Sequence, residues 1–231
     1  MSVFVIGDTH LSLGTDKPMD VFRGWDDYVG RLEKNWRALV SPDDIVVIDG
    51  DVSWAMKLED CDADFTFLHS LPGKKYLVKG NHDYWWETMR KMENYIAERG
   101  FDTIGFIFNS AVAAGGHALC GTRGWFFDDE SEHSKKVILR ERERLRRSIE
   151  AGLAMEKEPI VFLHYPPFFD GRQVDEIYSV LTEYNVRRCF FGHVHGETTG
   201  RYDDFTRDGI RFSLISADRL GFTPYLVRKS P

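Results

Sequence analysis

The chain reads VFVIGDTH at residues 3–10, and this octapeptide indicates how the rest of the sequence is organised. Its first four residues are apolar and mostly β-branched, which is typical of a strand buried on both faces of a parallel sheet. A glycine ends the run, and an aspartate and a histidine follow it. We therefore expect a buried strand over 3–6 whose exit presents Asp8 and His10.

Four later apolar runs end in the same way. They cover residues 45–48, 76–78, 160–163 and 189–191, and they lead into Asp49-Gly50-Asp51, Gly80-Asn81-His82-Asp83, His164 and Gly192-His193-Val194-His195. Ligands of open parallel sheets bind outside the carboxyl ends of the strands, where the connecting loops converge. We expect the polar side chains of all five exits to gather at this edge.

Helical patterns lie between the first strands. Apolar residues recur at three- and four-residue intervals from Trp25 to Leu39, and a second helix is expected over 60–71. Strands that alternate with helices favour an α/β layered fold. Residues 102–120 and 209–227 contain short apolar pieces broken by turn residues, which predict antiparallel hairpins. No repeat or interdomain linker is evident, so we expect residues 1–231 to form a single domain.

The composition excludes several classes of protein. With 231 residues, 42% hydrophobic and 29% charged, the chain can bury a sizeable core. The formal charge of −7 offers no basic surplus, so nucleic acid and anionic lipid are not expected partners. No signal-peptide core or membrane-spanning run is present, and three scattered cysteines (Cys61, Cys120, Cys189) fit reduced, buried thiols. We expect a cytoplasmic protein without membrane association.

The strand exits offer an array of metal ligands. Seven oxygen or imidazole donors come from five strand ends: Asp8, His10, Asp51, Asn81, His164, His193 and His195. This set contains no cysteine and suits hard or borderline divalent metals such as manganese, iron or zinc. One ion needs three or four protein ligands, whereas seven donors with one shared carboxylate suit two ions that each keep a place for water. The sequence therefore predicts a dinuclear centre.

The ordered motifs resemble the calcineurin-like metallophosphoesterases. They are Asp8-x-His10, Gly50-Asp51, Gly80-Asn81-His82-Asp83, His164 and Gly192-His193-x-His195, and they lie closest to bacterial phosphodiesterase-like members. The resemblance implies a β-sandwich of two mixed sheets flanked by helices, with the metals at the C-terminal ends of the strands. It also implies a ligand assignment: Asp8, His10 and His195 for one ion, Asn81, His164 and His193 for the other, and Asp51 as the bridge.

The same resemblance implies a mechanism. A hydroxide that bridges the two metals attacks phosphorus in line, and His82 protonates the leaving oxygen or stabilises the transition state. In the protein Ser/Thr phosphatase branch a later aspartate steadies this histidine, but Trp54 stands at that position here. The orienting partner of His82 is therefore left open. Asp83 either orients the site or caps a helix that begins near Tyr84.

The substrate is expected to be a small phosphodiester or a nucleotide-like molecule. Alternatives are a phosphomonoesterase or phosphoprotein phosphatase, a nuclease, and a non-catalytic scaffold, which retention of every metal ligand disfavours. Arg123, in a glycine-flanked turn, is either a phosphate clamp or an ordinary surface arginine. Aromatic residues at 84–86, 125–127 and 165–169 either stack a nucleobase or belong to the core. The oligomeric state is not predicted.

Two further segments have candidate roles. Residues 134–156 form an expected helix with apolar residues on one side and many lysines and arginines elsewhere. This pattern is typical of a solvated surface helix, and an anion-binding face is the alternative. Residues 11–24 are rich in glycine, proline and aspartate, and we expect them to form a loop at the entrance of the site.

Overall fold

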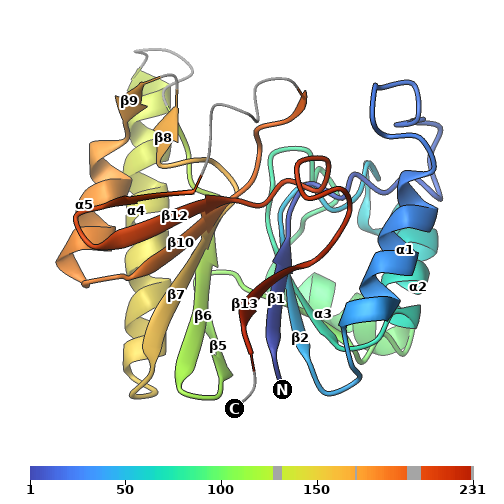
Figure 1. The fold of residues 1–231 in the computed structure, drawn as a ribbon, viewed down its shortest axis with the longest axis horizontal. Helices are drawn as coiled ribbons and strands as arrows, with labels where there is room; N and C mark the ends of the chain where they lie inside the picture. Colours follow the sequence, from blue (N-terminus) through green and yellow to red (C-terminus); the bar gives the residue numbers. More distant parts are fainter. Residues whose placement is uncertain (127–131, 170, 197–203, 230–231) are drawn as a thin grey trace.

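Two β-sheets pack face to face, with helices on their outer sides (Figure 1). The structure is a computed structural model that describes residues 1–126, 132–169, 171–196 and 204–229, without the side chains of residues 132 and 133. The predicted α/β fold of two mixed sheets flanked by helices is confirmed. It belongs to the layered architectures in which each sheet buries both faces.

The first sheet has the strand order β13-β1-β2-β3-β4. Its strands are β1 (Val3–Ile6), β2 (Ile45–Asp49), β3 (Lys74–Val78), β4 (Ile104–Phe106) and β13 (Tyr225–Arg228). Strands β1 to β4 are parallel, and β13 pairs antiparallel with β1. The helices on its outer face are α1 (Tyr28–Leu39), the 3₁₀ turn η1 (Leu58–Cys61), α2 (Asp62–Ser70) and α3 (Met89–Glu98).

The second sheet has the strand order β11-β12-β10-β7-β6-β5. Its strands are β5 (Ala111–Ala114), β6 (His117–Thr122), β7 (Glu158–Leu163), β10 (Arg188–Phe191), β11 (Phe205–Arg207) and β12 (Ile210–Leu214). Helices α4 (Glu132–Leu153) and α5 (Asp175–Glu183) cover its outer face, and a small ribbon joins β8 (Phe168–Phe169) to β9 (Arg172–Gln173).

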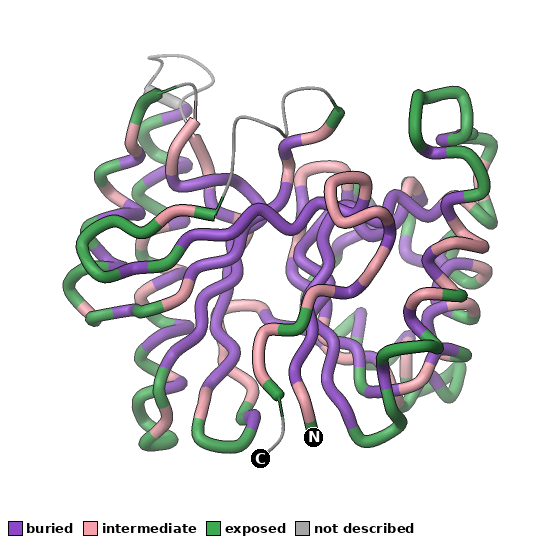
Figure 2. Tube along the Cα trace, in the orientation of Figure 1, coloured by how far each residue is buried: buried purple, intermediate pink, exposed green. Residues whose placement is uncertain are grey.

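The core lies in three layers, which follow from the alternation of side chains along each strand. In β1, Phe4 and Ile6 face the helices, whereas Val3 and Val5 face the second sheet. Strands with both faces covered need apolar residues at every position, which explains the unbroken runs in the sequence. Figure 2 shows β1 and β2 buried along their whole length, in contrast to residues 13–24 of the loop after β1, most of which are exposed.

Several predicted elements need correction. Residues 102–120 contain one hairpin, β5–β6, but β4 is a parallel neighbour of β3. Gly105 interrupts the apolar pattern of β4 because a Cβ there would lie 2.9 Å from the Tyr76 ring, so this glycine permits close packing and not a turn. In the tail, β12 pairs parallel with β10 and antiparallel with β11, and β13 joins the other sheet.

The helices begin and end close to their predicted limits. Helix α1 starts at Tyr28, so Trp25 precedes it, and Leu39 at its end is exposed. Helix α4 ends at Leu153, three residues before the expected end, with Glu156 beyond it at a φ of 57°. All three cysteines are buried free thiols, as predicted. Among the described helices, none combines the length and apolar character needed to span a membrane.

Candidate metal centre

The loops that leave β1 and β2 stay paired beyond the ends of the strands. The amides of Asp8 and His10 donate to the carbonyls of Gly50 and Asp51, each at 2.9 Å. Asp8, His10 and Asp51 all have left-handed backbones, with φ values of 57°, 45° and 48°. Such conformations cost free energy in non-glycine residues, so they persist only where the surroundings fix them. These hydrogen bonds fix the exits and place both carboxylates at the same end of the sheet, one in each of the two clusters described below.

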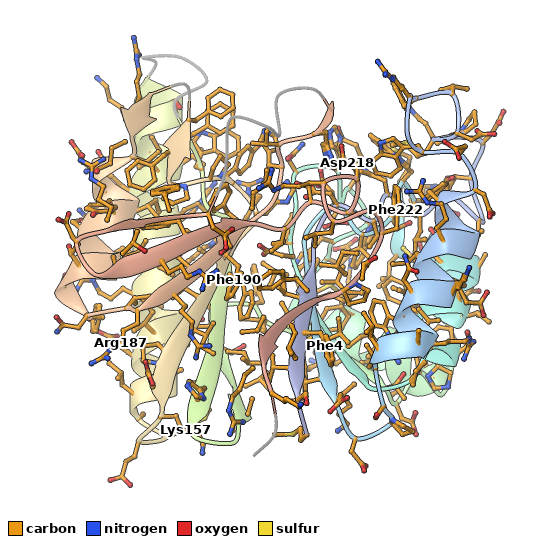
Figure 3. The ribbon with its side chains drawn as sticks, viewed as in Figure 1. Phe4, Lys157, Arg187, Phe190, Asp218 and Phe222 are labelled. Atoms are coloured by element: carbon orange, nitrogen blue, oxygen red, sulfur yellow. The ribbon has the colours of Figure 1, made fainter. Side chains whose placement is uncertain are left out.

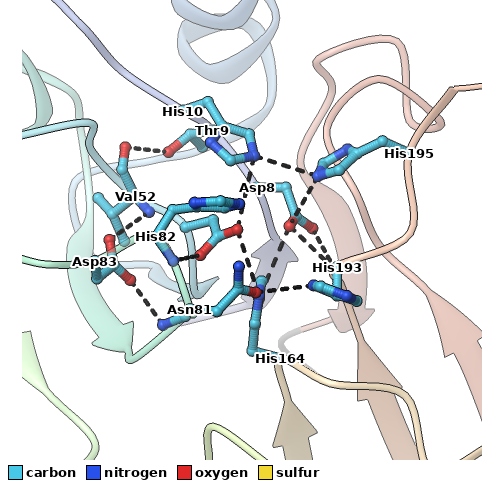
Figure 4. A network of polar contacts seen from close by, with 12 residues as sticks. Asp8, Thr9, His10, Val52, Asn81, His82, Asp83, His164, His193 and His195 are labelled. Carbon is cyan, nitrogen blue, oxygen red and sulfur yellow. Dashed lines mark hydrogen bonds and ion pairs between the residues drawn. The ribbon is translucent and has the colours of Figure 1, made fainter. Parts of the chain in front are cut away.

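One cluster of potential ligands contains Asp8, His10 and His195, whose donor atoms lie within 4.8 Å of one another. Nε2 of His195 lies 3.2 Å from Nε2 of His10 and 3.2 Å from Oδ1 of Asp8 (Figure 4). On its other side, Nδ1 of His195 lies 3.4 Å from Oδ1 of Asp218. A carboxylate on the second ring nitrogen is the usual way of orienting a metal-binding histidine.

A second cluster contains Asp51, His164 and His193, again within 4.8 Å. Oδ1 of Asn81 lies 2.7 Å from Nε2 of His164 and 2.9 Å from Nδ1 of His193 (Figure 4). Oδ2 of Asp51 is 3.4 Å from Nε2 of His164 and 3.8 Å from Nε2 of His10. Asp51 therefore lies between the two clusters, at the position that a shared ligand would occupy.

Each cluster pairs one imidazole of raised pKa with one of lowered pKa. Burial disfavours charge on His195 and His164, but the carboxylates of Asp8 and Asp51 outweigh it and raise their pKa values to about 10 and about 9. Burial lowers the pKa of His10 and of His193 to about 4. Each cluster therefore stabilises positive charge and also offers a neutral imidazole, the form that binds metals.

These features fit a pair of divalent ions. Nε2 of His195 lies 3.2 Å from both Nε2 of His10 and Oδ1 of Asp8, so these three donor atoms are close enough to bind one cation together. The donors are nitrogen and oxygen only, and the carboxylates are almost fully buried. Buried charges of this kind are normally paired or coordinate metals. The ligand roles of the seven residues themselves stay predictions.

Close packing at the site explains two of the glycines in the motifs. A Cβ on Gly80 would collide with the backbone amide and side chain of Asp51. A Cβ on Gly192 would lie 2.5 Å from Oδ2 of Asp8. Glycine is therefore required at both positions, because any side chain would push a carboxylate out of the cluster.

His82 is held beside the clusters by its backbone and by aromatic packing. Its amide donates to Oδ1 of Asp51 at 2.7 Å, and its half-buried ring lies 4.6 Å from the indole of Trp54. Trp54 also stacks on His10 at 4.9 Å. Among the described residues, nothing hydrogen-bonds to Nδ1 of His82. Where the protein phosphatase branch is expected to use a carboxylate, this chain supports the ring with an indole.

Asp83 does not cap a helix, so that alternative is wrong. Residues 84–88 are not helical, and α3 begins at Met89 behind a Thr88 cap. The buried carboxylate of Asp83 instead accepts hydrogen bonds from the amides of Val52 and Gly80, at 2.8 and 2.7 Å, and from the Trp85 indole at 3.0 Å. It connects the exits of β2 and β3, while its orienting role in catalysis stays a prediction.

Arg123 lies apart from the two clusters. Nη2 of Arg123 is 3.7 Å from the buried carboxylate of Glu141 on α4, and its guanidinium lies over Trp125. Arg144 pairs with the same carboxylate. The charged side of α4 thus contains a buried glutamate and its partners, a feature that neither alternative for this helix anticipated. The phosphate-clamp role of Arg123 stays a prediction.

The aromatic segments divide between core and site. Trp85 and Trp86 are buried in the core, Tyr84 is exposed, and Phe127 lies outside the described residues. Phe126 packs on Phe169, and its ring lies 5.4 Å from that of His193. The core interpretation is thus correct for the two tryptophans, while the segment around Phe126 borders the second cluster.

Asp218 is a site residue that the sequence reasoning missed. It lies in the loop after β12, above the ends of both sheets (Figure 3), and also accepts a hydrogen bond from the amide of Gly196 at 2.7 Å. Like Asp8 and Asp51, Asp218 is an acidic residue shortly after a strand. The signal was hidden because Arg211 and Ser213 interrupt the apolar run of β12.

Comparisons with known proteins agree with this picture. A sequence profile described as calcineurin-like phosphoesterase matches residues 1–197. Similar solved structures include a phosphopantetheinyl hydrolase from Mycobacterium tuberculosis, at 15% identity and a TM-score of 0.54, covering 100% of this chain and 96% of that one. A protein from Thermus thermophilus is 14% identical, with a TM-score of 0.58 and coverages of 91% and 86%. No curated protein is significantly similar in sequence. At these identities the structural likeness concerns the fold alone.

Proposed function

The chain belongs to the calcineurin-like phosphoesterase family, and from that premise we propose that it hydrolyses a small phosphodiester or nucleotide-like substrate with two divalent ions. The observation that supports this most directly is the pair of ligand clusters with Asp51 between them. Asp8, His10 and His195 would hold one ion, Asn81, His164 and His193 the other, and Asp51 would be shared. When bound, such ions supply Lewis acidity and a water of lowered pKa.

The protein side chains would then perform three tasks. The backbone-fixed carboxylates Asp8 and Asp51 hold negative charge in place before any ligand arrives, which avoids reorganisation during the reaction. The imidazole of His82, held against Trp54, lies beside both clusters and donates a proton to the leaving ester oxygen. The burial of both carboxylates limits bulk water and strengthens every electrostatic interaction at phosphorus.

The test compares a diester with a monoester. The protein is stripped of metal and resupplied separately with manganese, iron, zinc or magnesium, and hydrolysis of bis(p-nitrophenyl) phosphate is measured beside p-nitrophenyl phosphate. Metal-dependent cleavage with preference for the diester is expected. Preference for the monoester would instead support a phosphomonoesterase, and inactivity on both with two metals bound would favour a binding scaffold.

A further inference from the structure

A cavity of about 650 Å³ opens beside the first ligand cluster. One wall consists of His10, His82 and His195, so the cavity begins where a phosphoryl group would lie. Pockets for small organic molecules have volumes of about 300–1,000 Å³. The space therefore exceeds what phosphate alone requires, and it extends away from the clusters toward the loop after β1.

Three aromatic residues belong to the rest of the lining, and the two tryptophans adjoin the histidine wall, since the Trp54 ring stacks on that of His10 and the Trp25 ring lies 6.0 Å from that of His195. Phe22, Trp25 and Trp54 line the cavity together with Met19. Neighbouring residues hold both tryptophans in place. Trp25 packs edge-on against Phe222 with ring centroids 5.0 Å apart, and Nε1 of Trp54 lies 3.2 Å from the sulfur of Met19. Phe22, in contrast, is 56% exposed although it is large and apolar. The packed rings of Trp25 and Trp54, together with the exposed ring of Phe22 at the mouth of the cavity, form a surface on which a flat aromatic group can stack.

Positive charge borders the same cavity. Arg23 and Arg219 are among its lining residues, and Lys17 lies over the Trp54 ring at 5.2 Å. The acidic residue of the lining, Asp218, already accepts hydrogen bonds from the amides of Gly196 and Arg219 and faces Nδ1 of His195. The mouth thus combines aromatic surface with guanidinium groups, which favour phosphate oxygens.

From these observations we infer that the cavity binds an aromatic group of nucleoside size, and that the substrate is a nucleotide with more than one phosphate. This inference rests on the proposed function, because it places the reacting phosphoryl group at the ligand clusters. Phe22, Trp25 and Trp54 contact the aromatic group, while Arg23 and Arg219 interact with the additional negative charge. Arg123, tied to Glu141 and outside the cavity lining, has no part in this recognition.

Calorimetric titration of the manganese-loaded protein tests this inference without relying on turnover. The probes are ADP, AMP, ribose 5-phosphate, hexyl phosphate and inorganic phosphate, with slow turnover checked separately. We expect affinity to fall in the order ADP, AMP, ribose 5-phosphate, with inorganic phosphate no tighter than the last. Binding of hexyl phosphate more tightly than AMP, or of AMP no more tightly than ribose 5-phosphate, would overturn the assignment of an aromatic group.

Two variants with matched controls locate the binding. Phe22→Ala should weaken ADP and AMP by about fivefold to tenfold and leave phosphate unchanged, whereas Val21→Ala, at an exposed neighbour outside the lining, should change none of them. Arg23→Gln should weaken ADP more than AMP, whereas Arg37→Gln on the exposed side of α1 should have no effect. Equal losses for phosphate and nucleotides would contradict the inference.

The nucleotide-binding test and the hydrolysis test of the proposed function can fail independently of each other. Phe22 and Arg23 are exposed, so both variants should fold, and quenching of tryptophan fluorescence by AMP provides a second readout from Trp25 and Trp54. Nucleotide binding without metal-dependent hydrolysis of any phosphoester would refute the proposed function and keep the cavity assignment. Hydrolysis of bis(p-nitrophenyl) phosphate without nucleotide binding would support the proposed function and refute the cavity assignment.

Discussion

The predicted ligands from the first sheet and those from the second sheet are held in different ways. Asp8, His10 and Asp51 leave β1 and β2 on loops joined by backbone hydrogen bonds, with left-handed conformations at all three. Among the predicted ligands of the second sheet, the backbone amide of His193 donates to both carboxylate oxygens of Asp8. Nδ1 of His195 lies 3.4 Å from Oδ1 of Asp218. In the second set, main chain holds His164, whose Nδ1 lies 3.2 Å from the carbonyl oxygen of Asp49, and His193 also has a left-handed φ of 71°. The second set differs because His193 and His195 depend in addition on the carboxylates of Asp8 and Asp218.

The residues that supply the negative charge are therefore held differently from the second-sheet imidazoles that would complete the coordination of each ion. Both carboxylates of the predicted ligand set, Asp8 and Asp51, belong to the first set, so the negative charge that attracts cations is placed by the paired exits of β1 and β2. His195 is oriented by the carboxylate of Asp218, which a single substitution can remove, whereas His164 faces the backbone carbonyl of Asp49. Substitutions should therefore have graded effects, which depend on whether they remove charge, the proton donor, an orienting contact or only support between loops.

Asp51→Asn should have the largest effect, because it removes the charge that lies between both clusters. We expect both metal sites to weaken by more than the roughly 100-fold that loss of an outer partner can cause, and hydrolysis to be lost with them. Metal content after dialysis, measured by mass spectrometry, checks this. Two metals retained at full occupancy would show that Asp51 is not shared.

His82→Ala should leave metal content unchanged and reduce kcat by about 10²–10⁴-fold, the usual contribution of general acid catalysis. The backbone amide that donates to Asp51 survives the substitution, so the position of Asp51 should be kept. Steady-state kinetics beside metal analysis distinguishes the two effects. Unchanged kcat would remove His82 from the mechanism.

Asp218→Asn should affect one cluster selectively. Loss of the carboxylate beside Nδ1 of His195 should weaken metal binding at the Asp8 cluster by about 10- to 100-fold and spare the Asp51 cluster. Titration with manganese followed by calorimetry should then resolve two affinities where the unmodified protein shows closer values. A matched substitution, Asp204→Asn, changes an exposed acid paired with Arg211 and should have no effect.

Asp83→Asn should act mainly on stability. The asparagine side chain has a single acceptor oxygen, so it cannot accept from the backbone amides of both Val52 and Gly80 as the carboxylate does. The free energy of unfolding should therefore fall by about 1–3 kcal/mol. Urea denaturation measures this change. A loss of kcat beyond about tenfold with metals retained would instead support the catalytic role predicted for Asp83.

The sequence revealed the five strands that carry the predicted ligands more fully than the rest of the fold. Buried parallel strands need unbroken apolar runs, so β1, β2, β3, β7 and β10 and their polar exits were visible. Strand β4 was misread because Gly105 signals a turn locally but makes room for Tyr76 in the folded chain. That residues 1–231 form a single domain stays a prediction.

Contacts between distant segments were beyond the reach of sequence reasoning. Trp54 stood out at its position, but its stacking on His10 and His82 depends on how the β2 exit packs against the β1 exit. The cavity likewise draws its walls from segments around Phe22, Trp54 and Arg219. No local pattern marks residues that become neighbours only through tertiary structure.

The pairing of His10 with His195, 185 positions apart, has a consequence for how the protein is made. A ribosome releases the β1 exit long before β10 exists, so neither cluster can be completed during most of synthesis. Contacts that close so long a loop form slowly, because they join residues far apart in the sequence. Under the proposed function, neither ion can have its full set of ligands until both sheets have come together.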